Sequence, residues 1–127
     1  MRTFIAIELP QEIRETLGRL QEKLKAAGAD VKWVEPKNIH LTLKFLGEID
    51  EQIKDRINST LEEIYRTRKP FVIVLSSLGA FPNTISPRVI WIGISQGDSE
   101  VKEIAQAVEE HLETIGFPKE NREFSSH

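Results

Sequence analysis

Hydrophobic and polar positions along the chain follow two periods, one typical of helices and one typical of strands. Apolar side chains that recur at steps of three and four residues predict helices over 13–27, 53–68 and 101–115. Apolar or alternating runs predict strands over 4–9, 31–34, 38–47, 71–75 and 89–94. The pattern therefore predicts a chain in which short strands and amphipathic helices alternate.

Residues that favour the ends of helices lie where these helices are expected to begin or stop: Pro10, Gly28, Asp50 and Gly116. Turn residues at 35–38 join the expected strands 31–34 and 38–47, so we expect these two strands to be adjacent and antiparallel. Glycine and proline over 78–83 indicate a loop.

The strand over 38–47 carries the candidate chemistry. Read with a period of two, one face carries Leu41, Leu43 and Phe45, and the other carries His40, Thr42 and Lys44. Side chains on the same face of a strand are about 7 Å apart, so His40 and Thr42 can contact one phosphate-sized group together. The alternative is a half-exposed strand face with ordinary polar residues, and the pattern of this strand does not exclude it.

The order of apolar, glycine and histidine positions from the first strand to His40 occurs a second time further along the chain. Shifted by 88 residues, the apolar positions of the first helix fall on apolar positions of the third, and Gly28 falls on Gly116. His40 shifted by 87 residues falls on His127. We therefore expect a single bilobal domain over 1–127, with a first repeat at about 3–47 and a second at about 88–127. A pseudo-twofold axis would bring the two histidines together across a central cleft.

The first repeat continues past its histidine as Leu-Thr-Leu-Lys, whereas the sequence stops at His127. We therefore expect the second half to be truncated here, with a His-apolar-Thr-apolar strand that begins at His127. On this expectation the 127-residue form lacks the threonine of the second repeat and can be inactive for that reason.

Composition narrows the class of protein. The chain has no cysteine, which excludes disulfides and thiolate chemistry. With 17 basic and 20 acidic residues the net charge is −3, which argues against a broad basic surface that coats nucleic acid. Neither a signal peptide nor an apolar run of membrane-spanning length is present, so we expect a cytoplasmic protein with no membrane partner.

His111 lies at the border of the apolar stripe of the third expected helix, and we interpret it as a structural residue.

Several segments resemble one known family, the 2H phosphoesterases, and within it the RNA 2′,3′-cyclic phosphodiesterases, formerly called 2′-5′ RNA ligases. The most specific segment runs from Val31 to Glu48, and further likenesses lie at 4–7, 81–82, 88–91 and 116–127. The resemblance implies a bilobal, duplicated α+β fold, in which two antiparallel sheets with flanking helices surround a central cleft and two His-x-Thr motifs face that cleft. His40 and Thr42 match the first motif, and His127 matches the first residue of the second. The family often has proline before that histidine, where this chain has Ser126.

The resemblance implies hydrolysis of an RNA or nucleotide 2′,3′-cyclic phosphate to the 2′-phosphate. His40 and His127 would be the catalytic pair, because one neutral imidazole can accept a proton while one imidazolium donates another. Thr42 would bind the phosphate oxygens, and Lys44 would add positive charge to the same strand face. We expect no metal and no cofactor, since two histidines without acidic residues or cysteines at ligand spacing are a poor zinc pattern. We also expect a monomer.

Two other functions stay open from the sequence. One is a module that binds a nucleotide or an RNA end without cleaving it, in which histidine and threonine are phosphate ligands only. The other is a reversible 2′-5′ RNA ligase that uses the same chemistry in the opposite direction. Water at about 55 M favours hydrolysis over ligation in an open site.

Overall fold

The computed structural model describes residues 1–28, 30–81, 85, 89–120 and 124. In chain order the elements are β1 Arg2–Glu8, α1 Gln11–Ala26, the 3₁₀ turn η1 Pro36–Asn38, β2 His40–Glu48, α2 Glu51–Arg66, β3 Val74–Phe81, β4 Val89–Gln96 and α3 Asp98–Glu113. Within this part of the chain, β1 pairs with β2 and β3 pairs with β4, each pair antiparallel. The prediction of an α+β fold with two antiparallel sheets is confirmed.

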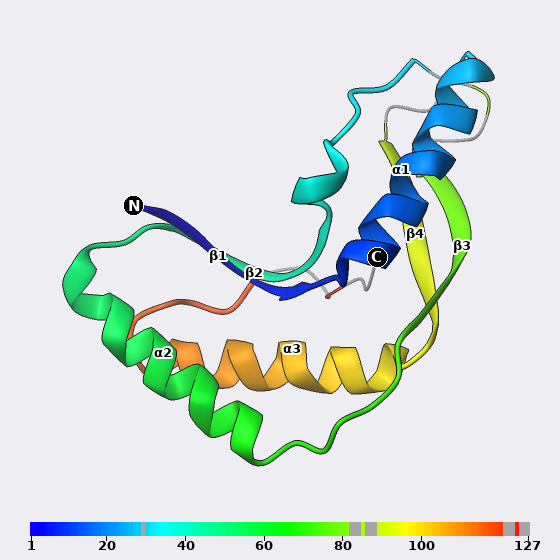
Figure 1. Ribbon diagram of the computed structural model, residues 1–127. Coiled ribbons are helices and arrows are strands. Elements are labelled where there is room, and N and C mark those ends of the chain that lie inside the picture. The colour runs from blue at the N-terminus through cyan, green and yellow to red at the C-terminus, as the bar shows by residue number, and fades with distance from the viewer. Residues whose placement is uncertain (29, 82–84, 86–88, 121–123, 125–127) are drawn as a thin grey trace.

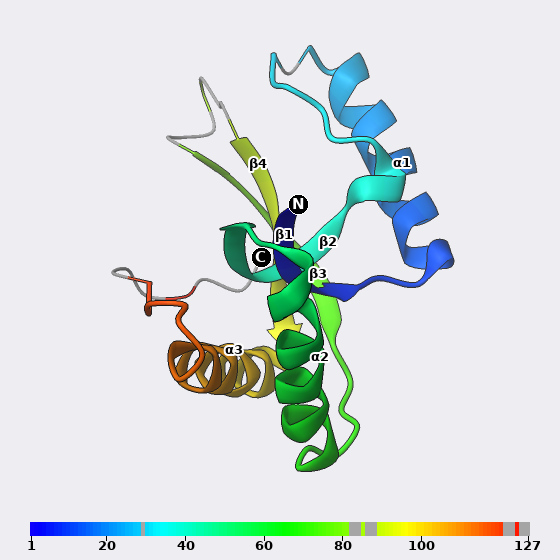
Figure 2. The same ribbon diagram turned by 90° about the vertical axis from the view of Figure 1, so that its left-hand side faces the viewer.

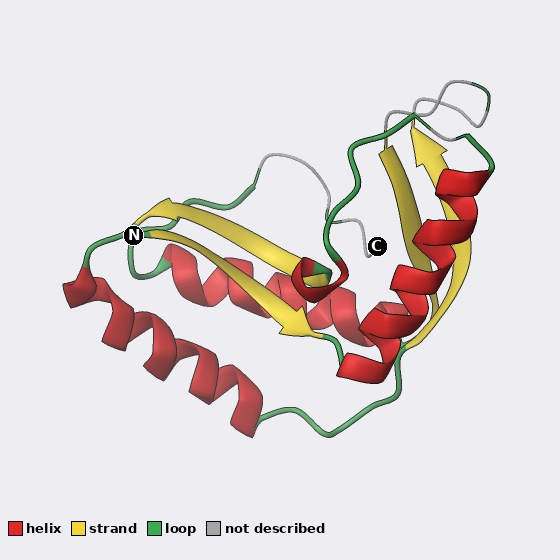
Figure 3. Ribbon diagram, turned by 45° about the horizontal axis from the view of Figure 1, so that its top comes forward, coloured by secondary structure: helices red, strands yellow, loops and turns green. Residues whose placement is uncertain are grey.

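Helices α2 and α3 cover one face of the β1–β2 sheet (Figure 1, Figure 3). The buried side chains of this layer come from both strands and both helices: Ile5, Leu41, Leu43, Ile57, Ile64, Val101, Ala105, Ala107, Val108 and Leu112. Apolar residues at helical spacing therefore form the core as the periodicity predicts. The helix α3 follows β4 along the chain, yet it contacts β2 of the other sheet.

Helix ends follow the predicted capping residues. The Asp50 carboxylate accepts hydrogen bonds from the backbone N–H groups of Gln52 at 3.1 Å and Ile53 at 3.2 Å, at the start of α2. Gly28 and Gly116 follow α1 and α3 with φ of 86° and 105°, a conformation that glycine adopts without a steric penalty. Among the described residues, none of the helices has the length and apolar character needed to cross a membrane.

The expected strand over 31–34 is wrong, because these residues are irregular and β2 pairs with β1 instead. The connection between α1 and β2 is held by side chains of α1. The Gln21 amide donates to the Val34 carbonyl at 2.8 Å, and the Arg14 guanidinium donates to the Lys37 carbonyl at 3.3 Å. This connection therefore follows α1, which lies apart from α2 and α3 (Figure 2).

The strand expected at 71–75 and the loop expected at 78–83 are also wrong in part, since β3 runs from Val74 to Phe81. Gly79 lies opposite Trp91 in the β3–β4 register. A Cβ atom at Gly79 would overlap the Trp91 indole ring, so this glycine permits a close approach between two strands and does not mark a turn.

A β-bulge in β2 changes the expected faces of this strand. Thr42 pairs with Ala6 and Lys44 pairs with Ile5, so Leu43 is an extra residue between two consecutive partners on β1. Leu43 and Lys44 both turn toward the helices, and Phe45 turns away, with 69% of its surface exposed. The prediction that Lys44 shares a face with His40, and Phe45 with Leu43, is therefore wrong.

Leu43→Ala should destabilise the protein by about 2–5 kcal/mol, because it leaves a cavity in the core where Leu43 is only 8% exposed. The matched change Phe45→Ala should change the free energy of unfolding by less than about 1 kcal/mol, because that side chain is mostly in solvent. Urea unfolding of both variants measures the two values. Equal losses would contradict the bulge and support simple alternation.

Candidate functional site

The face of the β1–β2 sheet that points away from the helices carries the first predicted motif. His40 pairs with Glu8 and Thr42 pairs with Ala6, so both side chains lie on this face. The turn η1 leads the chain into β2, with the Asn38 N–H donating to the Glu35 carbonyl at 2.8 Å. Both His40 and Thr42 are half-buried. The structure therefore brings together the imidazole and the hydroxyl that alternation in β2 predicts.

The His40 ring stacks on a phenylalanine that sequence reasoning missed. The ring centroids of Phe4 and His40 are 4.7 Å apart, and the two planes differ by 12°. Phe45 lies next to Phe4, with centroids 6.2 Å apart and a tilt of 50°. Both phenylalanines are exposed on the same face, Phe4 at 45%. The stack limits the orientations of His40, and only the register of β1 against β2 could have revealed it.

Within the described part of the chain, neither the His40 ring nitrogens nor the Thr42 hydroxyl has a hydrogen-bond partner. In a neutral imidazole one ring nitrogen donates a hydrogen bond and the other accepts one, and the threonine hydroxyl can do both. Both side chains are half-buried and lie on the face that also carries Phe4 and Phe45. This arrangement suits an anionic group such as a phosphate, with an apolar group against the phenylalanines.

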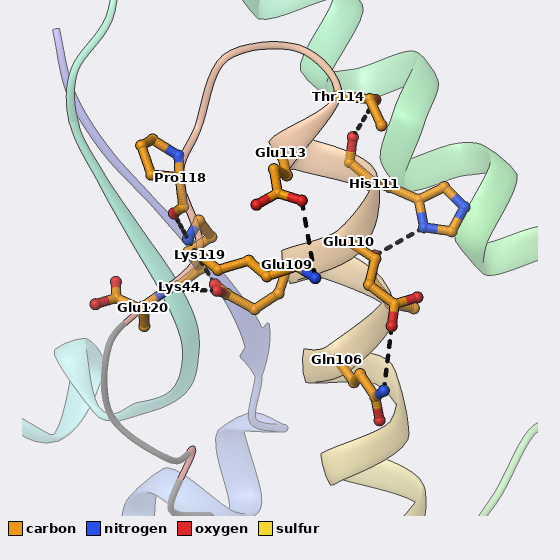
Figure 4. A network of polar contacts seen from close by, with 11 residues as sticks. Lys44, Gln106, Glu109, Glu110, His111, Glu113, Thr114, Pro118, Lys119 and Glu120 are labelled. Atoms are coloured by element: carbon orange, nitrogen blue, oxygen red, sulfur yellow. Dashed lines mark hydrogen bonds and ion pairs between the residues drawn. The ribbon is translucent and has the colours of Figure 1, made fainter.

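Lys44 lies on the opposite face of the sheet and takes no part in this cluster. Its ammonium forms an ion pair with Glu109 of α3 at 2.5 Å and donates to the Pro118 carbonyl at 2.9 Å (Figure 4). The Lys44 side chain is only 3% exposed. Its charge is therefore directed toward α3, and not toward the face that carries His40.

The other two histidines have different positions. His111 lies on α3, where its Nδ1–H donates to the Ala107 carbonyl at 2.8 Å, in keeping with its interpretation as a structural residue of the helix border. His127 lies outside the described residues. The pairing of His40 with His127 is therefore still a prediction.

Comparison with known proteins identifies the class. The family described as LigT like phosphoesterase matches residues 7–91. The RNA 2′,3′-cyclic phosphodiesterases of Archaeoglobus fulgidus and Methanocaldococcus jannaschii are 40% and 41% identical to this chain over its whole length, which spans 69% and 68% of theirs. The crystal structure of the Thermus thermophilus protein TT0787 superposes with a TM-score of 0.84 at 29% identity, over 100% of this chain and 71% of that one.

Fold and sequence together define a phosphoesterase. The chain belongs to the LigT-like phosphoesterase family, and the resemblance to 2H phosphoesterases is confirmed. A further likeness is to Escherichia coli LigT complexed with 3′-AMP, with a TM-score of 0.78 and 29% identity over 99% of this chain and 69% of that one.

Phe4→Leu should move the His40 ring-proton resonances downfield, because a stacked benzene ring shields the protons that lie over its face. Proton NMR of the imidazole signals measures the shift, with His40→Gln assigning them. Phe45→Leu is the matched control, since Phe45 contacts Phe4 and does not stack on His40. Unchanged His40 signals in Phe4→Leu would show that the stack is absent in solution.

Proposed function

We propose that this protein hydrolyses 2′,3′-cyclic phosphates of RNA ends or nucleotides to 2′-phosphates, without a metal ion. The observation that carries the proposal is the pair of His40 and Thr42 on one open sheet face, in a chain 40% identical to the RNA 2′,3′-cyclic phosphodiesterase of Archaeoglobus fulgidus. The relative from Methanocaldococcus jannaschii has the same name. Support for a phosphate ligand comes from Escherichia coli LigT, of which complexes with 3′-AMP and with phosphate are known.

The proposed reaction needs one base and one acid. A neutral imidazole takes a proton from water as the water oxygen attacks phosphorus. The bond from phosphorus to the 3′ oxygen breaks, and an imidazolium gives that oxygen its proton, which leaves a 2′-phosphate and a 3′-hydroxyl. His40 and His127 are the proposed pair, in either order of roles. Each proton transfer contributes about 10²–10⁴ in rate.

Thr42 is the proposed phosphate-binding residue. Its hydroxyl can donate to a non-bridging oxygen while the imidazole of His40 faces the reacting bond. Lys44 is not a proposed substrate contact, because its ammonium is paired with Glu109 on the other face of the sheet. The repeats at 3–47 and 88–127 remain our proposal for how two histidines come to face each other.

The full-length gene product should hydrolyse 2′,3′-cyclic AMP in the presence of EDTA, because imidazoles and hydroxyls supply every proposed step. The rate should have a bell-shaped dependence on pH, since one histidine must be neutral and the other protonated. Chromatography of the product distinguishes the 2′-phosphate from the 3′-phosphate. Loss of turnover with chelator would contradict the metal-free scheme, and binding without turnover would favour a nucleotide-binding module.

His40→Ala should lower kcat by at least about 10²-fold, because it removes one of the two proton-transfer groups. His111→Ala is the matched control, since that imidazole bonds within α3, and its kcat should stay within about threefold of the wild-type value. Steady-state kinetics on the cyclic nucleotide measures both. A His40→Ala variant that keeps more than about a tenth of wild-type turnover would remove His40 from the chemistry.

A further inference from the structure

A polar junction built on a buried lysine joins β2 to α3 and to the segment that follows α3. It consists of the side chains of Lys44 and Glu109, the carbonyl of Pro118 and the backbone N–H of Glu120, and we call it the Lys44 junction (Figure 4). One oxygen of Glu109 binds the Lys44 ammonium at 2.5 Å, and the other accepts from the Glu120 N–H at 2.6 Å. The same ammonium donates to the Pro118 carbonyl at 2.9 Å.

Burial makes the geometry of this junction demanding. The Lys44 and Glu109 side chains are only 3% and 18% exposed. Charges removed from water are tolerated when each is paired and further hydrogen bonds occupy the remaining donors and acceptors. Here both carboxylate oxygens are occupied, and the ammonium has two acceptors. A shift of strand, helix or loop would leave a buried charge with a missing partner, so the junction selects one arrangement of the three.

The junction joins the strand that carries His40 to the segment that precedes His127 in the sequence. Lys44 follows Thr42 closely on β2, so its position is tied to the strand that carries His40. Residues 118–120 belong to the connection that runs from α3 toward His127 in the sequence. Phe117 and Phe124, on either side of that segment, both pack against the main core.

We infer that the Lys44 junction aligns the chain leading to His127 with the strand carrying His40, and that Lys44 and Glu109 are positioning residues for the proposed reaction. The inference rests on the proposed function. Lys44 contributes through Glu109 and the 118–120 backbone and does not touch the substrate. The β-bulge at Leu43 is required for this role, because it turns the Lys44 side chain toward α3.

The test compares the full-length gene product with four variants of it. Lys44→Met and Glu109→Leu each break the junction, and the double variant replaces the ion pair with two apolar side chains of similar size. Such a replacement commonly restores the stability that a single change removes. Lys119→Met is the matched control, because Lys119 lies in the same segment and forms an exposed ion pair with Glu113 at 3.7 Å, with side chains 49% and 52% exposed.

The double variant should recover most of the melting temperature and still have a kcat about 10–100-fold below wild type, with KM changed by less than about threefold. Lys119→Met should match wild type in all three values. A double variant with restored stability and a kcat within about twofold of wild type would overturn the inference, because the junction would then be needed for folding only.

A second measurement does not depend on activity. The Glu120 amide should exchange slowly with deuterium in the wild type and much faster in Glu109→Leu and in the double variant, because both lack its acceptor. Fast exchange in the wild type would overturn the junction itself. A wild-type protein that protects this amide but does not hydrolyse cyclic phosphates would contradict the proposed function and leave the positioning of the 118–120 segment intact.

Discussion

The bulge at Leu43 is the constraint on which the rest of the site depends. Without the extra residue, the regular alternation of β2 would place Phe45 in the core and Lys44 beside His40. With the extra residue, Leu43 and the Lys44 ammonium both lie on the core face, and the Phe45 ring lies on the outer face. Glu109 of α3 is then required as a partner, since a buried unpaired lysine is costly. One inserted residue therefore decides both the chemistry of the open face and the contacts beneath it.

The two faces of the β1–β2 sheet consequently divide their roles. The open face has the side chains that can exchange protons or bind a phosphate, and it has Phe4 stacked on His40 to orient the ring. The covered face has Lys44, whose charge is neutralised by a carboxylate at 2.5 Å and gives little net field on the other side of the sheet. In the proposed reaction, positive charge at the phosphate therefore comes from the imidazolium of one histidine and not from Lys44.

Local signals in the sequence were sufficient for some features and not for others. The three helices and the Asp50 cap were predicted because periodicity and capping depend on neighbouring residues. The prediction for 31–34 was wrong because the Gln21 amide of α1 donates to the Val34 carbonyl. The strand propensity of these four residues carries no information about that tertiary contact. Gly79 was misread as a turn because its function is to admit Trp91 from the next strand. Both of these errors have a tertiary contact as their cause.

The same distinction applies to the site. His40 and Thr42 could be found by alternation within one strand, but Phe4 required the pairing register and Glu109 required the packing of α3 beneath β2. That packing has a wider consequence. Because α3 lies in the proposed second repeat and packs on β2 of the first, residues of both proposed repeats contribute to one core. The Lys44–Glu109 ion pair lies within that packing, so it links the strand that carries His40 to a helix of the proposed second repeat.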